Sequence, residues 1–165
     1  MKALVSIIMG STSDLPVMEK ACKWLNDNQI PFEVNALSAH RTPDAVESFA
    51  KGAKERGVKV IIAAAGMAAH LAGAIAANTT LPVIGIPCSS KVLEGMDALL
   101  STVMMPSGIP VATVAVNGGV NAALLSAQIL AVEDAELAAK LDARRAADAA
   151  KVLEKDAALQ AELNG

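Results

Sequence analysis

Two long stretches of this 165-residue chain contain no charged side chain, and they restrict the possible folds more than any other feature. Neither residues 60–90 nor residues 98–132 contain Asp, Glu, Lys or Arg. Apolar stretches of this length can cross a membrane. Here, however, repeated Gly and Pro residues divide both stretches into pieces of strand or helix length. The sequence therefore predicts buried strands and helices, and no membrane span.

Short apolar runs without polar alternation predict the strands. Residues 3–9 form the first run, which ends at Gly10, and its composition is typical of a strand buried on both faces of a parallel sheet. Further strand candidates are residues 32–37, 58–64, 82–86 and 111–116. Apolar residues recur at helical spacing between them: Leu15, Met18, Cys22 and Leu25, then Val46, Phe49, Ala50 and Ala53. This alternation predicts an α/β fold with a three-layer, doubly wound parallel sheet.

The length fits a single α/β domain over residues 1–165, with a core over residues 1–133 and a terminal helix over residues 134–165. The terminal segment holds 12 of the 31 charged residues, which predicts a solvated helix. Two further helices are predicted over residues 68–77 and 121–132, and both are apolar on nearly every face. One small sheet cannot bury all of this apolar surface, so we expect contact with further copies of the chain.

The overall composition excludes some partners and indicates a compartment. A net charge of -3, 2% aromatic residues and no Tyr offer neither a basic surface nor stacking platforms, so we expect no nucleic-acid partner. Cys22 and Cys88 are the only cysteines, and the chain does not begin with a signal-like segment. We therefore expect a reducing, cytoplasmic setting.

Ligands of open α/β sheets bind beyond the carboxyl ends of the strands, so the loops that follow strands are the first candidates for a site. The loop of residues 10–14 is built from small hydroxyl residues before a helix, which suits a phosphate or a ribose. Its alternative role is simple helix capping by Ser13 or Asp14. Motifs for dinucleotides or nucleoside triphosphates do not accompany it.

The loop of residues 38–43 places a cation and an imidazole side by side. Thr42 and Pro43 fit the N-cap and first position of a helix, which puts His40 and Arg41 at its N-terminus. Arg41 can clamp a phosphate. His40 is either a surface residue or a proton-transfer group, and its neighbour Arg41 favours proton transfer.

The third and fourth loops are less informative. Residues 65–71 form an apolar loop that can shield a site from water, and Gly66 permits a close backbone approach. His70 can bond to the backbone or contact a ligand. In residues 87–90, Cys88 would have to join His40 and His70 to hold a metal, but no spacing matches a zinc pattern. We expect no metal, and a packing role for Cys88.

Taken together, residues 9–14, 38–43, 65–71, 105–113 and 121–125 resemble the N5-carboxyaminoimidazole ribonucleotide mutase family, from residue 3 to about residue 135. The resemblance implies a flavodoxin-like fold, a homo-octamer, and an isomerase of de novo purine biosynthesis. It also implies a reaction without cofactor, metal or ATP, in which a carboxylate moves from N5 to C4 of the small-molecule substrate.

The same resemblance implies roles for individual residues. His40 would carry the proton between C4 and N5. The substrate-binding residues would be Ser11, Ser13, Asp14, Ser38, Ala39, Arg41, Gly66, Ala68, Ala69, His70 and Leu71. The loop from Gly66 to Leu71 would retain carbon dioxide and exclude water.

Two alternatives remain. The animal-type branch, which carboxylates aminoimidazole ribonucleotide directly, typically has Lys after the loop His and Arg-Ser-Asn in the third loop, whereas this chain has Arg41 and residues 67–70 read Met-Ala-Ala-His. Ala72, Ser107 and residues 116–119 also depart from the usual mutase pattern. The other alternative is a non-enzymatic nucleotide-binding module, although the acidic cluster of a receiver-like domain is missing at the predicted strand ends.

Overall fold

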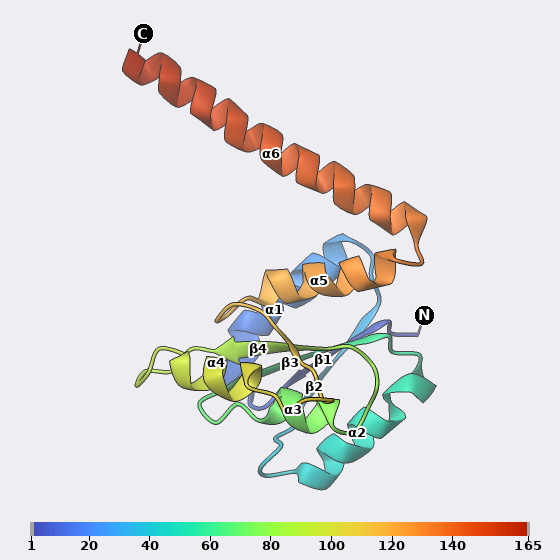
Figure 1. Ribbon diagram of the computed structural model, residues 1–165. Helices are drawn as coiled ribbons and strands as arrows, with labels where there is room; N and C mark the ends of the chain where they lie inside the picture. The colour runs from blue at the N-terminus through green and yellow to red at the C-terminus, as the bar shows by residue number, and fades with distance from the viewer. Residues whose placement is uncertain (1, 165) are drawn as a thin grey trace. The chain divides into compact units, whose positions relative to one another are not determined.

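Five strands form one parallel sheet in the order β2-β1-β3-β4-β5 (Figure 1). The computed structural model describes residues 2–164. The strands are β1 (Val5–Met9), β2 (Phe32–Ala36), β3 (Val60–Gly66), β4 (Val83–Cys88) and β5 (Ala112–Thr113). This strand order is that of flavodoxin-like folds. The predicted doubly wound parallel sheet is therefore confirmed.

Helices cover both faces of this sheet, as the three-layer prediction requires. Gly85 of β4 faces Ala72 and Thr102, which places α3 (Leu71–Ala76) and α4 (Met96–Val103) on one face. Figure 1 shows α2 (Pro43–Arg56) beside α3, and α1 (Leu15–Asp27) on the opposite face with the first turns of α5 (Gly119–Ala131). The backbone at Gly119 packs directly on that of Val17, where a Cβ atom would lie 2.3 Å from a carbonyl oxygen.

The core consists of the fully buried central strands and the apolar stripes of the helices. All five residues of β1 are buried, as are all six of β4. The predicted stripe of α2 is confirmed, because Val46, Phe49, Ala50 and Ala53 are buried. In α1 the buried residues are Met18, Ala21, Trp24 and Leu25. The stripe predicted for α1 is therefore only half right: Met18 and Leu25 are buried, but Cys22 is only half-buried and Leu15 is 40% exposed.

Two elements are shorter than predicted. β5, an edge strand, pairs with β4 only through Ala112 and Thr113. Beyond it the chain still follows β4, through bonds from Val114 N to the Gly85 oxygen and from Asn117 N to the Pro87 oxygen, but not as a regular strand. α3 begins only at Leu71, because the residues before it form tight turns, in which the backbone nitrogens of Ala69 and His70 bond to the carbonyl oxygens of Met67 and Ala68. The predicted helical segment over residues 68–77 is thus partly a loop.

The described residues divide into two compact units, of which the first ends at Ala127 and the second begins at Gln128. The second unit is dominated by α6 (Ala135–Asn164), which confirms the predicted terminal helix. Asp134 caps it by accepting a hydrogen bond from the backbone nitrogen of Leu137 at 3.0 Å. No helix within residues 2–164 is long and apolar enough to cross a membrane.

Candidate functional site

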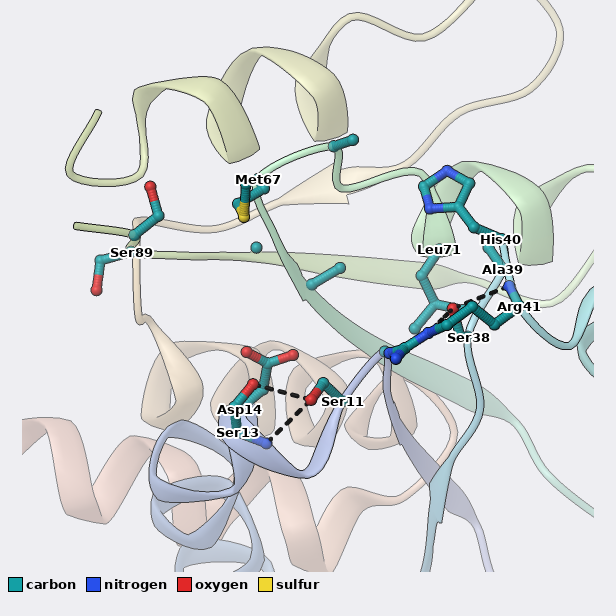
Figure 2. Close-up of a pocket in the computed structure, with 15 residues that line it drawn as sticks. Ser11, Ser13, Asp14, Ser38, Ala39, His40, Arg41, Met67, Leu71 and Ser89 are labelled. Atoms are coloured by element: carbon teal, nitrogen blue, oxygen red, sulfur yellow. Dashed lines mark hydrogen bonds between the residues drawn. The ribbon is translucent and has the colours of Figure 1, made fainter. Parts of the chain in front are cut away.

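A cavity of about 480 Å³ lies at the carboxyl ends of the strands, where the predicted loops meet (Figure 2). The register of the strands explains why these loops lie together. Met9 pairs with both Ala36 and Ala64, so that β1, β2 and β3 end at the same edge of the sheet. Ten of the predicted residues line the cavity: Ser11, Ser13, Asp14, Ser38, Ala39, His40, Arg41, Gly66, Ala68 and Leu71. Ala69 and His70, predicted as substrate-binding, do not line it.

The first loop uses Ser11, not Ser13 or Asp14, as its capping side chain. Ser11 Oγ accepts hydrogen bonds from the backbone nitrogen of Ser13 at 3.2 Å and from Ser13 Oγ at 2.9 Å, which caps the short 3-10 helix η1 (Thr12–Asp14). Asp14 makes no side-chain capping bond at the start of α1. Its carboxylate points into the cavity, as Figure 2 shows. The capping role considered for Ser13 and Asp14 is therefore wrong.

The second loop holds Arg41 through Ser38. Ser38 Oγ accepts bonds from the backbone nitrogen of Arg41 at 3.2 Å and from Arg41 Nε at 3.4 Å. Thr42 precedes Pro43, the first residue of α2, as predicted, but its hydroxyl bonds back to Ser38 and does not cap the helix. Among the described residues, no carboxylate forms an ion pair with Arg41. Its charge is thus available for an anionic ligand.

The two histidines of the chain form a pair. His40 Nε2 lies 2.8 Å from His70 Nδ1, with the rings edge to face at an interplanar angle of 85°. One ring nitrogen must donate and the other accept, so His70 can fix the orientation and tautomer of His40. His70 therefore contacts His40, which lines the cavity, but does not line the cavity itself.

Asp14 and Cys88 share a hydrogen bond beside the cavity. Burial raises the pKa of Asp14 above its ordinary value of 3.8, and the bond from the Cys88 thiol partly opposes this shift. Burial and the neighbouring Asp14 charge raise the pKa of Cys88 to about 12. The thiol is therefore protonated at neutral pH. Cys88 is buried, in agreement with the packing role predicted for it. Within residues 2–164, no three His, Cys, Asp or Glu side chains cluster to hold a metal ion.

Five residues of the cavity wall are not among the predicted substrate-binding residues. Gly10, Ala65 and Met67 belong to loops that were predicted to form the site, whereas Ser89 and Ser90 were missed. The fourth loop was considered only for Cys88, although the two serines that follow it carry the polar groups at this end. Their position directly after a buried strand was the signal that could have identified them.

Replacing Asp14 with Asn should raise the melting temperature of the ligand-free protein at pH 7. Because the pKa of Asp14 is raised in the folded state, its contribution to stability is fully present below pH 3.8 and is lost as the pH rises through the folded-state pKa. An amide avoids this loss. In thermal denaturation from pH 3 to pH 8, the melting temperature of Asp14→Asn should exceed that of the wild type at neutral pH, and the difference should vanish at the acid end. The control Asp142→Asn, at an exposed position, should show no such difference. A pH-independent difference would contradict the argument.

Comparison with known proteins supplies the family. The sequence model of the family described as AIR carboxylase matches residues 4–151. The N5-carboxyaminoimidazole ribonucleotide mutase of Bacillus subtilis is 57% identical over 156 residues, which are 93% of this chain and 96% of that protein. The mutase of Pyrococcus horikoshii is 57% identical over 140 residues, 85% of this chain and 79% of that protein.

Other relatives widen the comparison. Phosphoribosylaminoimidazole carboxylase of Saccharomyces cerevisiae is 54% identical over 141 residues, which are 86% of this chain but 25% of that protein. The crystal structure of Treponema denticola PurE superposes with a TM-score of 0.86 at 33% identity, over 96% of this chain and 99% of that one. The matching residues include all four loops of the cavity, and this chain therefore belongs to the AIR carboxylase family.

Proposed function

We infer that this protein is an N5-carboxyaminoimidazole ribonucleotide mutase, an isomerase that moves a carboxylate from N5 to C4 of its substrate in purine biosynthesis. The observation that carries this inference is a cavity in which the guanidinium of Arg41 and the imidazole of His40 come from one loop, and in which Arg41 forms no ion pair with any described residue. A cation for a phosphate beside a group that can move a proton is what such a ribonucleotide reaction needs. Membership of the family and the similarity to several mutases over most of the chain support it.

We assign substrate contacts from the positions of the side chains. Arg41, Ser11 and Ser13 provide the cation and hydroxyl groups for the phosphate, and Asp14 provides an acceptor for ribose hydroxyls. The cavity volume of about 480 Å³ is in the range of small-molecule sites. Ser38 and Ala39 complete the wall on the side of Arg41. These assignments agree with the residues that the family resemblance implies.

In the proposed mechanism the bond between N5 and the carboxylate carbon breaks first, and N5 keeps the electron pair. The released carbon dioxide stays in the cavity, because the apolar residues Met67, Ala68 and Leu71 border it. C4 then attacks the carbon dioxide and forms a carbon–carbon bond. His40 takes the proton that C4 loses and returns it to N5. His70 orients His40 through their shared hydrogen bond.

These steps move one carboxylate and one proton without any change of oxidation state. We therefore propose that the reaction proceeds without a redox cofactor, a metal or ATP. We also propose that the protein acts in the cytoplasm, where Cys22 and Cys88 would remain the free thiols that the structure has.

An assay with the synthetic N5-carbamate tests this function. The mutase should convert the carbamate to the C4-carboxylated ribonucleotide at the same initial rate with and without added bicarbonate. The name of the yeast relative suggests a second activity, direct carboxylation of aminoimidazole ribonucleotide. That enzyme would need bicarbonate and would form product from the uncarboxylated ribonucleotide. Binding without turnover of either substrate would identify a non-enzymatic nucleotide-binding module.

We propose that the protein is a homo-oligomer, most simply an octamer. Helix α4 supports this proposal, because four large apolar side chains on it or at its end are 44% to 76% exposed: Met96, Leu100, Val103 and Met104. An apolar stripe of this kind is typical of an interface. The large side chains of α3, in contrast, are buried within the chain itself.

Light scattering at micromolar concentration should give a mass several times the 16.8 kDa of one chain. Leu100→Asp should lower this mass, because a carboxylate in the interface would lose its hydration. Lys151→Asp, which changes an exposed residue of α6, is the control for added negative charge. A monomeric wild-type protein would disprove the proposed assembly.

A further inference from the structure

We propose that Asn117 is a positioning residue that holds Ser89 so that the Ser89 hydroxyl donates a hydrogen bond to the bound ribonucleotide. This inference rests on the proposed function and adds a specificity contact to the same cavity. Ser89 lines the cavity, whereas Asn117 does not.

Two hydrogen bonds join these residues, which lie 28 positions apart in the sequence. Asn117 Oδ1 accepts a bond from the backbone nitrogen of Ser89 at 3.0 Å. Asn117 Nδ2 donates a bond to Ser89 Oγ at 2.9 Å. One amide side chain therefore fixes both the backbone and the side chain of Ser89.

The backbone of Asn117 is anchored at the same place. Its nitrogen donates a bond to the carbonyl oxygen of Pro87 at 2.9 Å, so Asn117 contacts the chain on both sides of Cys88. Asn117 has a φ of 57°, in the left-handed region. Among residues other than Gly, Asn adopts this conformation with little cost. The turn after β5 is thus shaped to present an amide to the fourth loop.

The count of donors and acceptors at Ser89 predicts its role. Its oxygen accepts the bond from Asn117, which leaves the hydroxyl hydrogen as a donor. Among the described residues, this hydrogen has no acceptor. Because Ser89 borders the cavity, the free donor is available to an acceptor atom of the ligand.

The position of Ser89 indicates which part of the ligand it contacts. Figure 2 shows Ser89 at the end of the cavity opposite to Arg41 and His40. With the phosphate at Arg41 and the reacting atoms C4 and N5 at His40, the ribose is the part of the ligand that can extend towards Asp14 and Ser89. Asp14 interacts with Cys88, the residue before Ser89. We therefore assign the hydrogen bond to a ribose oxygen, and not to the phosphate.

The test compares Asn117→Gly with Ser89→Ala in the full-length protein. Asn117→Gly keeps the left-handed backbone but removes the amide that orients Ser89, and Ser89→Ala removes the hydroxyl itself. Both variants should therefore raise the KM for the carbamate and the Kd for the product ribonucleotide about 10-fold, with kcat changed less. Because both substitutions remove one contact, the double variant should be no worse than either single variant. Affinity for inorganic phosphate, which reports on the Arg41 end, should stay unchanged.

Two further variants make the outcome specific. Gln29→Gly is the matched control, since Gln29 also has a left-handed backbone (φ 58°) but precedes β2 and is not part of the cavity wall. It should leave KM and Kd unchanged. Asn117→Asp keeps an acceptor but cannot donate, so the Ser89 hydroxyl would turn towards the new carboxylate. This variant should show the same loss even if Asn117→Gly fails to fold.

The possible outcomes separate the two proposals. Wild-type protein that binds the ribonucleotide but does not turn over the carbamate would refute the mutase assignment, while the Kd values would still test the Asn117–Ser89 pair. Unchanged Kd in Ser89→Ala would refute the ligand contact. A loss in Ser89→Ala without any loss in Asn117→Gly and Asn117→Asp would refute the positioning role. Additive losses in the double variant would refute it too.

Discussion

Replacing His40 with Asn should lower kcat at least ~100-fold, the lower range for the loss of a general acid-base group. Asn has a similar reach and can keep one hydrogen bond to His70, but it cannot take up a proton at neutral pH. In the proposed mechanism, the proton lost from C4 then has no side chain to carry it to N5. Turnover of the carbamate, measured beside the Kd for the product and the melting temperature, checks this expectation.

His70→Asn is the matched comparison, because it changes the other member of the same pair. His40 would keep its place in the cavity wall and its proton-carrying ring, and would lose only its partner at 2.8 Å. We therefore expect a smaller loss of kcat than for His40→Asn. A folded His40→Asn protein that binds the ribonucleotide and keeps near-normal turnover would disprove the mechanism. Equal losses in both variants would show that the pair acts as one unit.

The sheet could be predicted because its strands carry an unusually clear pattern. β1 is buried throughout and apolar except for Ser6, and a parallel sheet covered on both faces accommodates several such strands. The edge strand β5 and the short helix α3 were harder to predict. Their limits depend on backbone conformation and on pairing with β4, whereas residues 111–116 and 68–77 are apolar in sequence except for Thr113 and His70. Hydrophobic pattern alone cannot separate a buried loop from a buried element.

The cavity could be predicted loop by loop, but its internal contacts could not. Residues on one loop, such as Ser38 and Arg41, reveal their proximity through sequence spacing. The pairs His40–His70 and Ser89–Asn117 join loops that are 30 and 28 residues apart. The order of the strands brings these loops together, and sequence spacing contains no signal for such a pairing. For this reason His70 was predicted as a possible ligand contact, and Asn117 was not considered at all.

Arg41→Ala should weaken binding of the product ribonucleotide about 10-fold to 150-fold, the equivalent of about 1.5 to 3 kcal/mol for a charge-assisted hydrogen bond. The guanidinium has no competing carboxylate among the described residues, and Ser38 Oγ at 3.4 Å from Nε holds it towards the cavity. The charge is therefore both unneutralised and oriented before the ligand arrives. Calorimetric titration gives the Kd directly, and the loss should grow smaller as salt screens the interaction.

Three comparisons connect this loss to the phosphate. Arg41→Lys keeps the charge but not the forked donor geometry, so its loss should lie between those of wild type and Arg41→Ala. Arg145→Ala removes an exposed arginine of α6 and should leave the Kd unchanged. The dephosphorylated nucleoside should bind wild type and Arg41→Ala equally, because the part of the ligand that Arg41 contacts is missing. If Arg41→Ala instead bound the ribonucleotide as tightly as the wild type, Arg41 would have no place in the site and the phosphate would have to bind elsewhere.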